Sequence, residues 1–296
     1  MAIPESQLIT WSHQGSITQS STTYNTIKGA LEVSSAPYAD KNYQVFLQGS
    51  YGNDTNIYAE SDVDIVIKLN DSFQSDLSLL TDYQKTAFQS DLADATYTAS
   101  DFKKDVRKVL VDKYGGDVNV GAKAIVIAGN VSRRKADVIT AIQFRRYFKF
   151  NGIQDQSYEE GICFYNAGGE RIANYPKQHA TNCTTKHQNT SKWFKPMVRV
   201  VKNMRGKMID DGLLEAGIAP SYYIEGLLYN VPNENFGTSY EDSMLNSINW
   251  LRNADRSKFV CANNQYMLLD GNANVTWNSK NCDLFLNGIV ELWNSW

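Results

Sequence analysis

A strand that alternates acidic and apolar residues, placed shortly after a Gly-Ser pair, most constrains how this chain can fold. Residues 62–69, DVDIVIKL, alternate with a period of two, which is typical of a half-buried strand. The segment YQVFLQG at 43–49 also has strand character and ends in a glycine. Because side chains i and i+2 of a strand point the same way, Asp62 and Asp64 are expected to project from one face.

Two carboxylates on one strand face repel each other unless a cation lies between them. Mg²⁺ is usually bound by one or two carboxylates, and substrate phosphates and water complete its ligands. A third acid would complete a two-metal site, and Asp137, near the start of a strand predicted at 136–144, is the candidate. An exposed edge strand is the alternative interpretation of Asp62 and Asp64, and a turn carboxylate is the alternative for Asp137.

The Gly49-Ser50 pair at the end of the first strand has the character of a phosphate-binding turn. Glycine permits close approach of the backbone, and Ser50 offers a hydroxyl and an N–H at the expected start of a short helix. An ordinary strand-to-helix turn is the alternative. The pair, eleven intervening residues and an Asp-X-Asp strand together form a more specific signal than any one of them.

Composition narrows the class of protein. The 296 residues carry 29 Lys and Arg against 32 Asp and Glu, a net charge of −3, which argues against a basic nucleic-acid coat. Four widely spaced cysteines without a CxxC pair predict reduced thiols in a cytoplasmic protein. No 18-residue apolar run and no signal peptide is present, so no membrane association is expected.

The order of elements predicts an α+β fold, with a mixed sheet lobe followed by a helical lobe. We place the boundary near residue 190, which gives lobes of 1–190 and 191–296. An N-terminal helix is expected over 5–34, with Gly15 as a candidate break. Further helices and strands are predicted at 101–114, 122–129, 136–144, 161–166, 193–204, 220–232, 244–251 and 284–293.

These motifs resemble the DNA polymerase β-type nucleotidyltransferases and, more narrowly, the bacterial CD-NTases related to cyclic GMP-AMP synthase, in their CdnE-like clade. The resemblance runs from the N-terminal helix to about residue 232 and is weaker in the last 60 residues. It implies a nucleotidyltransferase core with an N-terminal spine helix and a helical lobe similar to that of oligoadenylate synthases and poly(A) polymerases. The segments that carry it are QGSYGNDTNIYAESDVDIVI, RRKADVITAIQFRRY, NYPKQH, FKPMVRVVKNMR and PSYYIEGLLYNVP.

The resemblance implies an enzyme that makes a cyclic di- or oligonucleotide from NTPs, with ATP and UTP as the expected substrates. Asp62, Asp64 and Asp137 would hold two Mg²⁺ ions, which Mn²⁺ could replace. The product would serve CBASS anti-phage signalling in a bacterial cytoplasm, through a downstream effector, and no nucleic-acid activator is expected. A linear oligonucleotide or poly(A)-type nucleotidyltransferase and a non-catalytic nucleotide- or RNA-sensing module are the competing hypotheses.

A basic stretch at 177–207 holds eight Lys or Arg residues and no acid, which suits a triphosphate. Lys195, Arg199 and Lys202 share one helix face, for which a solvated surface or a nucleic-acid patch is the alternative. The resemblance implies that Lys202 contacts the triphosphate and that Ser221 and Tyr222 bind phosphate and stack on a base. A helix cap is the alternative for Ser221, and a core aromatic is the alternative for Tyr222.

Base selection requires a group that reads a Watson–Crick edge. Asn174 offers a donor and an acceptor, which suits uracil, and the resemblance associates an asparagine near this position with pyrimidine use. Asn182 is the competing candidate, and a turn-capping asparagine is the plain alternative. His179, Cys183 and His187 are spaced like ligands on a helix, but three ligands without a fourth do not predict structural zinc.

Overall fold

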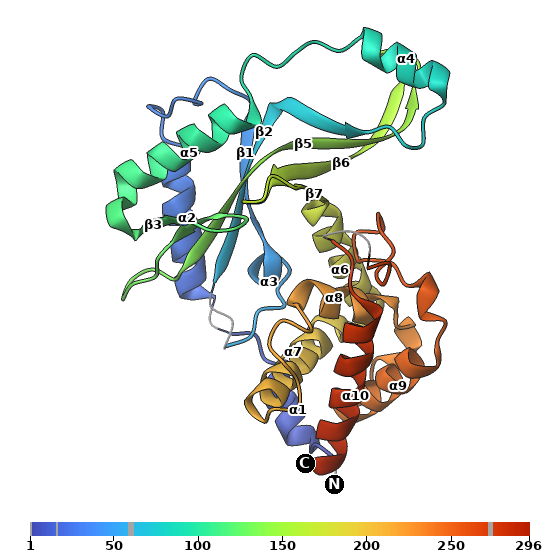
Figure 1. Cartoon of the computed structure of the whole chain (residues 1–296). Helices are drawn as coiled ribbons and strands as arrows, with labels where there is room; N and C mark the ends of the chain where they lie inside the picture. The colour runs from blue at the N-terminus through green and yellow to red at the C-terminus, as the bar shows by residue number, and fades with distance from the viewer. Residues whose placement is uncertain (1, 16, 59–61, 272–274) are drawn as a thin grey trace. The chain divides into compact units, whose positions relative to one another are not determined.

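The computed structural model describes residues 2–15, 17–58, 62–271 and 275–296. The chain forms two compact units, which are described separately (Figure 1). The sheet unit comprises residues Thr18–Gln48 and Asp62–Pro176, and the helical unit comprises Met1–Ile17, Gly49–Ser61 and Lys177–Trp296.

The sheet unit is built on strands that all belong to one mixed sheet. The strands are β1 Tyr43–Gln48, β2 Val63–Asp76, β3 Val118–Val120, β4 Ile125–Ile127, β5 Ala136–Phe150, β6 Gln156–Tyr165 and β7 Arg171–Asn174. Their order is β1-β2-β5-β4-β3, while β6 pairs with β5 and β7. Of the pairings between described strands, only β2 with β5 is parallel. The predicted mixed sheet is confirmed.

The helices of the sheet unit are α2 Thr18–Leu31, α4 Asp82–Ser90, α5 Ala99–Tyr114 and a 3-10 turn at Gly115–Asp117. Helix α5 matches the predicted helix at 101–114. It begins with a capping box between Thr98 and Asp101, which satisfies two backbone N–H groups at the helix start. Its buried face, Phe102, Val106 and Leu110, packs toward the sheet on the side where α2 also lies (Figure 1).

Strand β2 is buried on both faces over residues 65–69, whereas the sequence predicts a half-buried strand. Ile65, Val66 and Ile67 are all fully buried. The reason is position, because β2 lies between β1 and β5 and α2 and α5 contact it. Such an enclosed strand has a near-continuous apolar sequence.

The helical unit contains the predicted helices of the second half of the chain. Its elements are α1 Glu5–Ser12, α3 Gly49–Gly52, α6 Pro176–Asn189, α7 Phe194–Asp210, α8 Ser221–Asn230, α9 Tyr240–Asn253 and α10 Ser279–Ser295, with 3-10 turns at Asn233–Asn235 and Arg256–Lys258. Met197, Val200 and Met204 of α7 are fully buried in its core. The expected break at Gly15 is present, because α1 ends at Ser12.

The two units divide the chain differently from the single boundary predicted near residue 190. Residues Met1–Ile17 and Gly49–Ser61 belong with the helices and not with the sheet. Helix α1 packs on α7, and the segment after α3 hydrogen-bonds to α7 and α8. These contacts join residues more than 140 positions apart, which composition and periodicity do not reveal.

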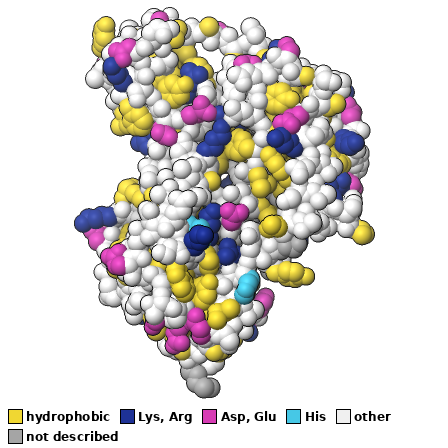
Figure 2. Space-filling view, turned by 180° about the vertical axis from the view of Figure 1, so that it is seen from behind, with side chains coloured by type: hydrophobic (Ala, Val, Ile, Leu, Met, Phe, Trp, Pro, Cys, Tyr) yellow, Lys and Arg dark blue, Asp and Glu magenta, His cyan; other side chains and the backbone are white. Residues whose placement is uncertain are grey.

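The four cysteines are free and buried, in agreement with the expectation of reduced thiols. On the face drawn in Figure 2, lysine and arginine side chains lie among acidic side chains and form no single extended basic region. None of the helices in the described ranges combines the length and apolar character that crossing a membrane requires.

Candidate functional site

The parallel pairing of β2 with β5 brings the three predicted aspartates together. Asp64 lies directly opposite Asp137 in the ladder, and Val63 lies opposite Ala136. Neighbouring strands lie about 4.8 Å apart, and paired residues project from the same face. Asp62 immediately precedes β2 and lies two residues before Asp64. The sheet therefore presents three carboxylates at one place.

Lys135, which the sequence analysis did not single out, lies among these carboxylates. Its Nζ is 2.5 Å from Asp62 Oδ2 and 3.9 Å from Asp137 Oδ1. Its backbone carbonyl accepts a hydrogen bond of 2.9 Å from the Val63 N–H, which holds it beside the start of β2. The hydrogen bond to Asp62 raises the pKa of Lys135, and the charges of Asp137, Asp62 and Asp64 add to this effect against its burial. An ammonium thus neutralises part of the acidic cluster.

Asp137 retains an unused ligand atom. Its buried Oδ1 has no hydrogen-bond partner among the described residues. Burial raises the pKa of this carboxyl, the charge of Lys135 opposes the shift, and Asp62 adds to it. A buried carboxylate oxygen without a hydrogen-bond donor, near two further carboxylates, is the oxygen-rich environment that a hard divalent cation prefers. These residues therefore fit a divalent metal site.

The Gly49-Ser50 pair forms the predicted turn from a strand into a short helix. Gly49 has a φ of +66°, a conformation that favours glycine, and opens α3 directly after β1. The backbone N–H of Asn53 donates to the Gly49 carbonyl over 3.0 Å, and that of Thr55 donates to the Ser50 carbonyl over 2.9 Å. The turn is therefore closed by the residues that follow it.

The basic face of α7 binds this same segment and is not a solvated surface. Lys195 Nζ lies 2.9 Å from Asp54 Oδ2, and Arg199 donates to the Asp54 carbonyl over 2.6 Å. Lys202, completely buried, donates to the Thr55 carbonyl over 2.9 Å. The buried Thr55 carbonyl requires a donor, and Lys202 supplies it. The positive charge of α7 thus lies under the segment that follows Gly49-Ser50.

A buried carboxylate on α8, Glu225, completes the support of the segment. It accepts a hydrogen bond of 2.8 Å from Asn53 and a further one from the Thr55 hydroxyl. His179 Nε2 lies 2.6 Å from Glu225 Oε2. The sequence analysis missed Glu225, although a single acid within the apolar run YYIEGLLY is unusual and could have drawn notice.

Ser221 and Tyr222 begin α8, as the sequence predicts. Pro220 occupies the cap position, and the Ser221 hydroxyl accepts a hydrogen bond of 3.1 Å from Arg205. The ring of Tyr222 stacks on His179 with centroids 4.9 Å apart. A ring packed in this way is closer to a core aromatic, the alternative interpretation of Tyr222, than to an open ring on which a base could stack.

Asn174 ends β7 and lies on the carboxylate face of the sheet. It pairs with Ile162, which in turn pairs with Gln143. Gln143 lies six positions after Asp137 along β5, so the two side chains project from the same face. Its Oδ1 accepts the Tyr175 N–H over 2.8 Å. Asn182, the competing candidate, lies in the helical unit and donates to the Ala262 carbonyl over 2.8 Å. The sheet position favours Asn174.

Gly161 allows β7 to reach this position. A methyl group added at Gly161 would lie 2.5 Å from the Asn174 carbonyl oxygen and 2.8 Å from the Tyr175 ring. Gly161→Ala is therefore expected to displace the end of β7 and to lower the free energy of unfolding by about 1–3 kcal/mol.

Thermal and denaturant unfolding measure this loss, and Gly29→Ala is the matched control. Gly29 lies within α2 with nothing within 4 Å of the added methyl, so alanine there should stabilise by about 0.5–1 kcal/mol. A Gly161→Ala protein as stable as the wild type would contradict the close approach.

A further group of Lys and Arg residues, at 133–149, is largely paired with acids inside the sheet unit. Arg133 lies 2.8 Å from Asp117, and Lys149 lies 2.5 Å from Asp155. The guanidinium of Arg145 lies 4.0 Å from the centroid of the Phe73 ring. Cations engaged in this way offer little to a nucleic-acid backbone.

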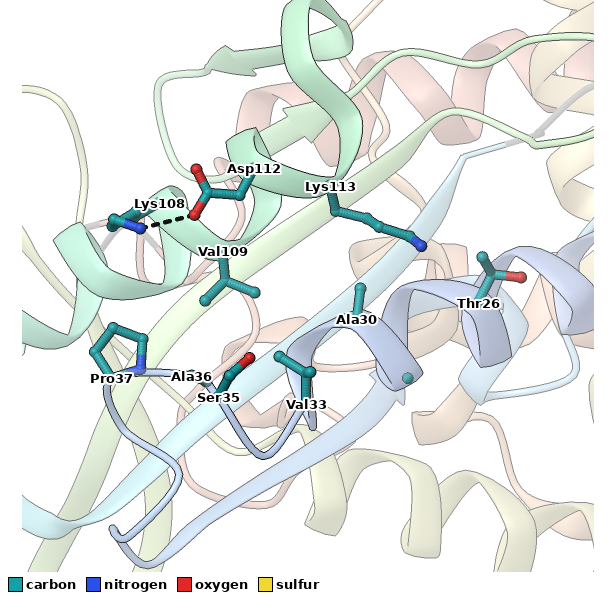
Figure 3. A pocket seen from close by; sticks show the side chains of 11 residues that line it. Thr26, Ala30, Val33, Ser35, Ala36, Pro37, Lys108, Val109, Asp112 and Lys113 are labelled. Atoms are coloured by element: carbon teal, nitrogen blue, oxygen red, sulfur yellow. Dashed lines mark hydrogen bonds and ion pairs between the residues drawn. The ribbon is translucent and has the colours of Figure 1, made fainter.

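A surface cavity of about 420 Å³ lies between α2 and α5 (Figure 3). Val33 and Val109 line it, and a pair between Lys108 and Asp112, 2.7 Å apart, lies at its edge. None of the candidate site residues lines this cavity.

The chain is similar to known proteins along its whole length. A model of the cGAS/DncV-like nucleotidyltransferase C-terminal helical domain matches residues 181–294. The cyclic UMP-AMP synthase of Rhodothermus marinus is 40% identical over 298 residues, which cover 100% of this chain and 99% of the relative.

Solved structures extend the similarity to the fold. The Rhodothermus marinus CdnE c-UMP-AMP synthase with Apcpp and Upnpp matches with a TM-score of 0.89 and 39% identity, covering 99% of this chain and 97% of that one. The Elizabethkingia meningoseptica CdnE cyclic dinucleotide synthase with GTP and Apcpp matches with a TM-score of 0.76 and 30% identity, covering 99% and 98%. The predicted α+β nucleotidyltransferase fold is confirmed. This full-length similarity shows that the chain is a nucleotidyltransferase of the CD-NTase family, in its CdnE-like clade.

Proposed function

We propose that this enzyme joins UTP and ATP into a cyclic dinucleotide. The observation that carries the proposal is the register of β2 and β5, which sets Asp64 opposite Asp137 with Asp62 two residues away. The similarity to a cyclic UMP-AMP synthase over the whole chain supports the choice of nucleotides.

Asp62 and Asp64 are assigned to the cation that accompanies the donor triphosphate, and all three aspartates to a second cation. Two Mg²⁺ ions, when bound, would lower the pKa of the acceptor 3′-hydroxyl and neutralise charge on the phosphates. The 3′-oxygen attacks the α-phosphorus, a phosphodiester forms, and pyrophosphate leaves. The contribution of the chain is mainly positioning and charge neutralisation. In the second step, the 3′-oxygen of the linear product attacks the α-phosphorus of its own triphosphate, a second phosphodiester closes the ring, and a second pyrophosphate leaves.

Gly49, Ser50 and Ser221 are assigned to the phosphates. Lys202 is assigned to the same function. Its ammonium donates to the Thr55 carbonyl, and its positive charge would act on the phosphates from beneath the turn. Tyr222 is assigned to stacking on the base, and Asn174 would read uracil with its amide.

The product would act on a downstream effector in a bacterial CBASS system, within the cytoplasm. A linear product is the main alternative, and the same three aspartates would serve it. Phosphatase treatment separates the two outcomes, because a cyclic product has no terminal phosphate to remove.

The test is to incubate the protein with each labelled NTP alone and in pairs, with Mg²⁺ or Mn²⁺, and to chromatograph the phosphatase-treated products. We expect a resistant product only when UTP and ATP are both present. Linear products, or no NTP consumption in any mixture, would contradict the proposal.

Lys135 provides an independent test of the metal site. Its ammonium neutralises charge on Asp62 and Asp137, to which a divalent cation would bind. Because the two cations compete, Lys135→Gln is expected to bind Mn²⁺ about two- to fivefold more tightly. Calorimetric titration of the nucleotide-free protein measures this affinity.

Lys149→Gln is the matched control for this experiment. Lys149 lies 2.5 Å from Asp155, and its side chain is 48% exposed. The Lys135 side chain, 2.5 Å from Asp62, is 46% exposed. Lys149→Gln should leave Mn²⁺ affinity unchanged. Equal affinity in all three proteins would show that Lys135 does not compete with the metal.

A further inference from the structure

The helical unit buries a charged network that has no assigned part in the chemistry. Glu225 is 2% exposed, His179 3% and Thr55 0%. Removing a carboxylate from water is costly unless the charge is paired and its oxygens are hydrogen-bonded. A network of this burial therefore indicates a function that a pair of apolar side chains would not perform.

Both oxygens of Glu225 are directed at the segment that follows α3. Oε2 accepts the Asn53 amide over 2.8 Å, and Oε1 accepts the Thr55 hydroxyl. His179 Nε2, from α6, approaches Oε2 to 2.6 Å, and its ring is fixed by stacking on Tyr222. The carboxylate is thus fixed by His179 of α6, and it in turn holds the segment that follows α3.

The same two residues of the segment hold the Gly49-Ser50 turn through their backbone. The Asn53 N–H binds the Gly49 carbonyl over 3.0 Å, and the Thr55 N–H binds the Ser50 carbonyl over 2.9 Å. Asn53 and Thr55 therefore each connect Glu225 to the turn, with the side chain bound to the carboxylate and the backbone N–H bound to a carbonyl of the turn. Between the two residues, Asp54 has a φ of +56°, a strained conformation that side-chain anchors help to maintain.

A bound metal ion is the alternative explanation of this cluster. Ligand atoms of His179, Cys183 and Glu225 all lie within 4.8 Å of one another, and Nδ1 of His179 has no hydrogen-bond partner among the described residues. His187 is not part of the group, because its Nδ1 accepts the Lys195 N–H over 3.3 Å. Three ligands fall short of a closed structural zinc site, and the Glu225 oxygens already accept hydrogen bonds from protein donors. The hydrogen bonds favour positioning.

We infer that His179 and Glu225 are positioning residues that hold the Gly49-Ser50 turn in its phosphate-binding conformation. This inference rests on the proposed function, in which the turn binds the triphosphate. Preorganised donors avoid the cost of ordering a loop when the ligand binds, so loosening the anchor should weaken triphosphate binding.

Thr55→Val tests the anchor with a small change, because it removes the hydroxyl that Glu225 accepts and preserves the side-chain shape. We expect affinity for α,β-methylene ATP with Mg²⁺, measured by calorimetry, to fall about tenfold. Thr55→Ser retains the hydroxyl and should restore affinity to within about twofold of the wild type.

Thr190→Val is the matched control within the same unit. Thr190 is 4% exposed, and its hydroxyl donates to the Lys186 carbonyl and accepts the Phe194 N–H. This variant should lose stability in thermal unfolding as Thr55→Val does, while its nucleotide affinity stays within about twofold of the wild type. The comparison separates loss of positioning from general destabilisation.

Three results would overturn the inference. Thr55→Val could bind the analogue as tightly as the wild type, or Thr190→Val could lose affinity equally. Purified protein could contain one equivalent of zinc by mass spectrometry, with affinity lost on chelation in the wild type and in Thr55→Val alike. If the wild type itself bound no analogue, the proposed function would fail together with the inference.

Discussion

Asp137→Asn is expected to consume no NTP with either Mg²⁺ or Mn²⁺, a loss of at least about a thousandfold in product formation. Asparagine keeps the shape but lacks the charge that the cation requires, and Asp64→Asn should give the same result. Chromatography of labelled NTP after prolonged incubation measures the loss.

The stability of this variant should change in the opposite direction. Burial raises the pKa of Asp137, so its charged form destabilises the metal-free protein at neutral pH. The neutral amide removes this penalty, and denaturant unfolding in chelator should show Asp137→Asn to be at least as stable as the wild type. Asp155→Asn is the control, because Asp155 is exposed and paired with Lys149 away from the triad. Product formation by Asp137→Asn above one part in a hundred would contradict its assignment.

Glu225→Gln is expected to lower the free energy of unfolding by about 3–5 kcal/mol, as when one partner of a buried charged network is removed. The new amide nitrogen would face the donors of Asn53, Thr55 or His179 without an acceptor. Denaturant unfolding measures the loss. Glu215→Gln, at an exposed position of the same unit, should change stability by less than about 0.5 kcal/mol.

The pH dependence of this difference identifies the charges. Burial works against the charge of Glu225, but His179, Lys202 and Thr55 hold its pKa below the usual value. Burial also disfavours a charged His179, yet Cys183 and Glu225 raise its pKa. The contribution of Glu225 to the free energy of unfolding is therefore present above its ordinary pKa and is lost in acid. The contribution of His179 is present below its ordinary pKa and is lost in alkali. The stability gap between wild type and Glu225→Gln should be largest between about pH 5 and 6.5 and should shrink above it. A gap that is constant from pH 5 to 10 would contradict a charged pair.

The local features of the site could be predicted from sequence because each depends on neighbouring residues. Alternation placed Asp62 and Asp64 on one face, and Gly49 marked the end of a strand. The helix starts at Thr98 and Pro220 carry ordinary local signals. The position of Asp137 near the start of a predicted strand made it the candidate third acid, and resemblance to a family then supplied the reaction.

The remaining features depend on contacts between distant segments. The basic face of α7 was expected to meet a triphosphate, but its cations bind the carbonyls and carboxylate of residues 54–55. Lys135 has no local sequence signal for a place in the site, and it is the strand pairing that sets it beside Asp62. Glu225 and His179 are separated by 46 positions, and periodicity does not pair residues across such distances.

The parallel ladder between β2 and β5 makes the juxtaposition of Asp64 and Asp137 depend on strand alignment. A shift of one residue would turn either Asp64 or Asp137 to the opposite face, and a shift of two would separate them by about 7 Å along the strand. The pairing register already shifts at the bulge between Leu69 and Phe73, which lies farther along β2 than the carboxylates. Length changes after Leu69 can therefore be absorbed without moving the three aspartates, whereas a single insertion between Asp64 and Leu69 would leave a folded sheet in which the alignment of Asp64 with Asp137 is lost or the rest of the ladder is shifted.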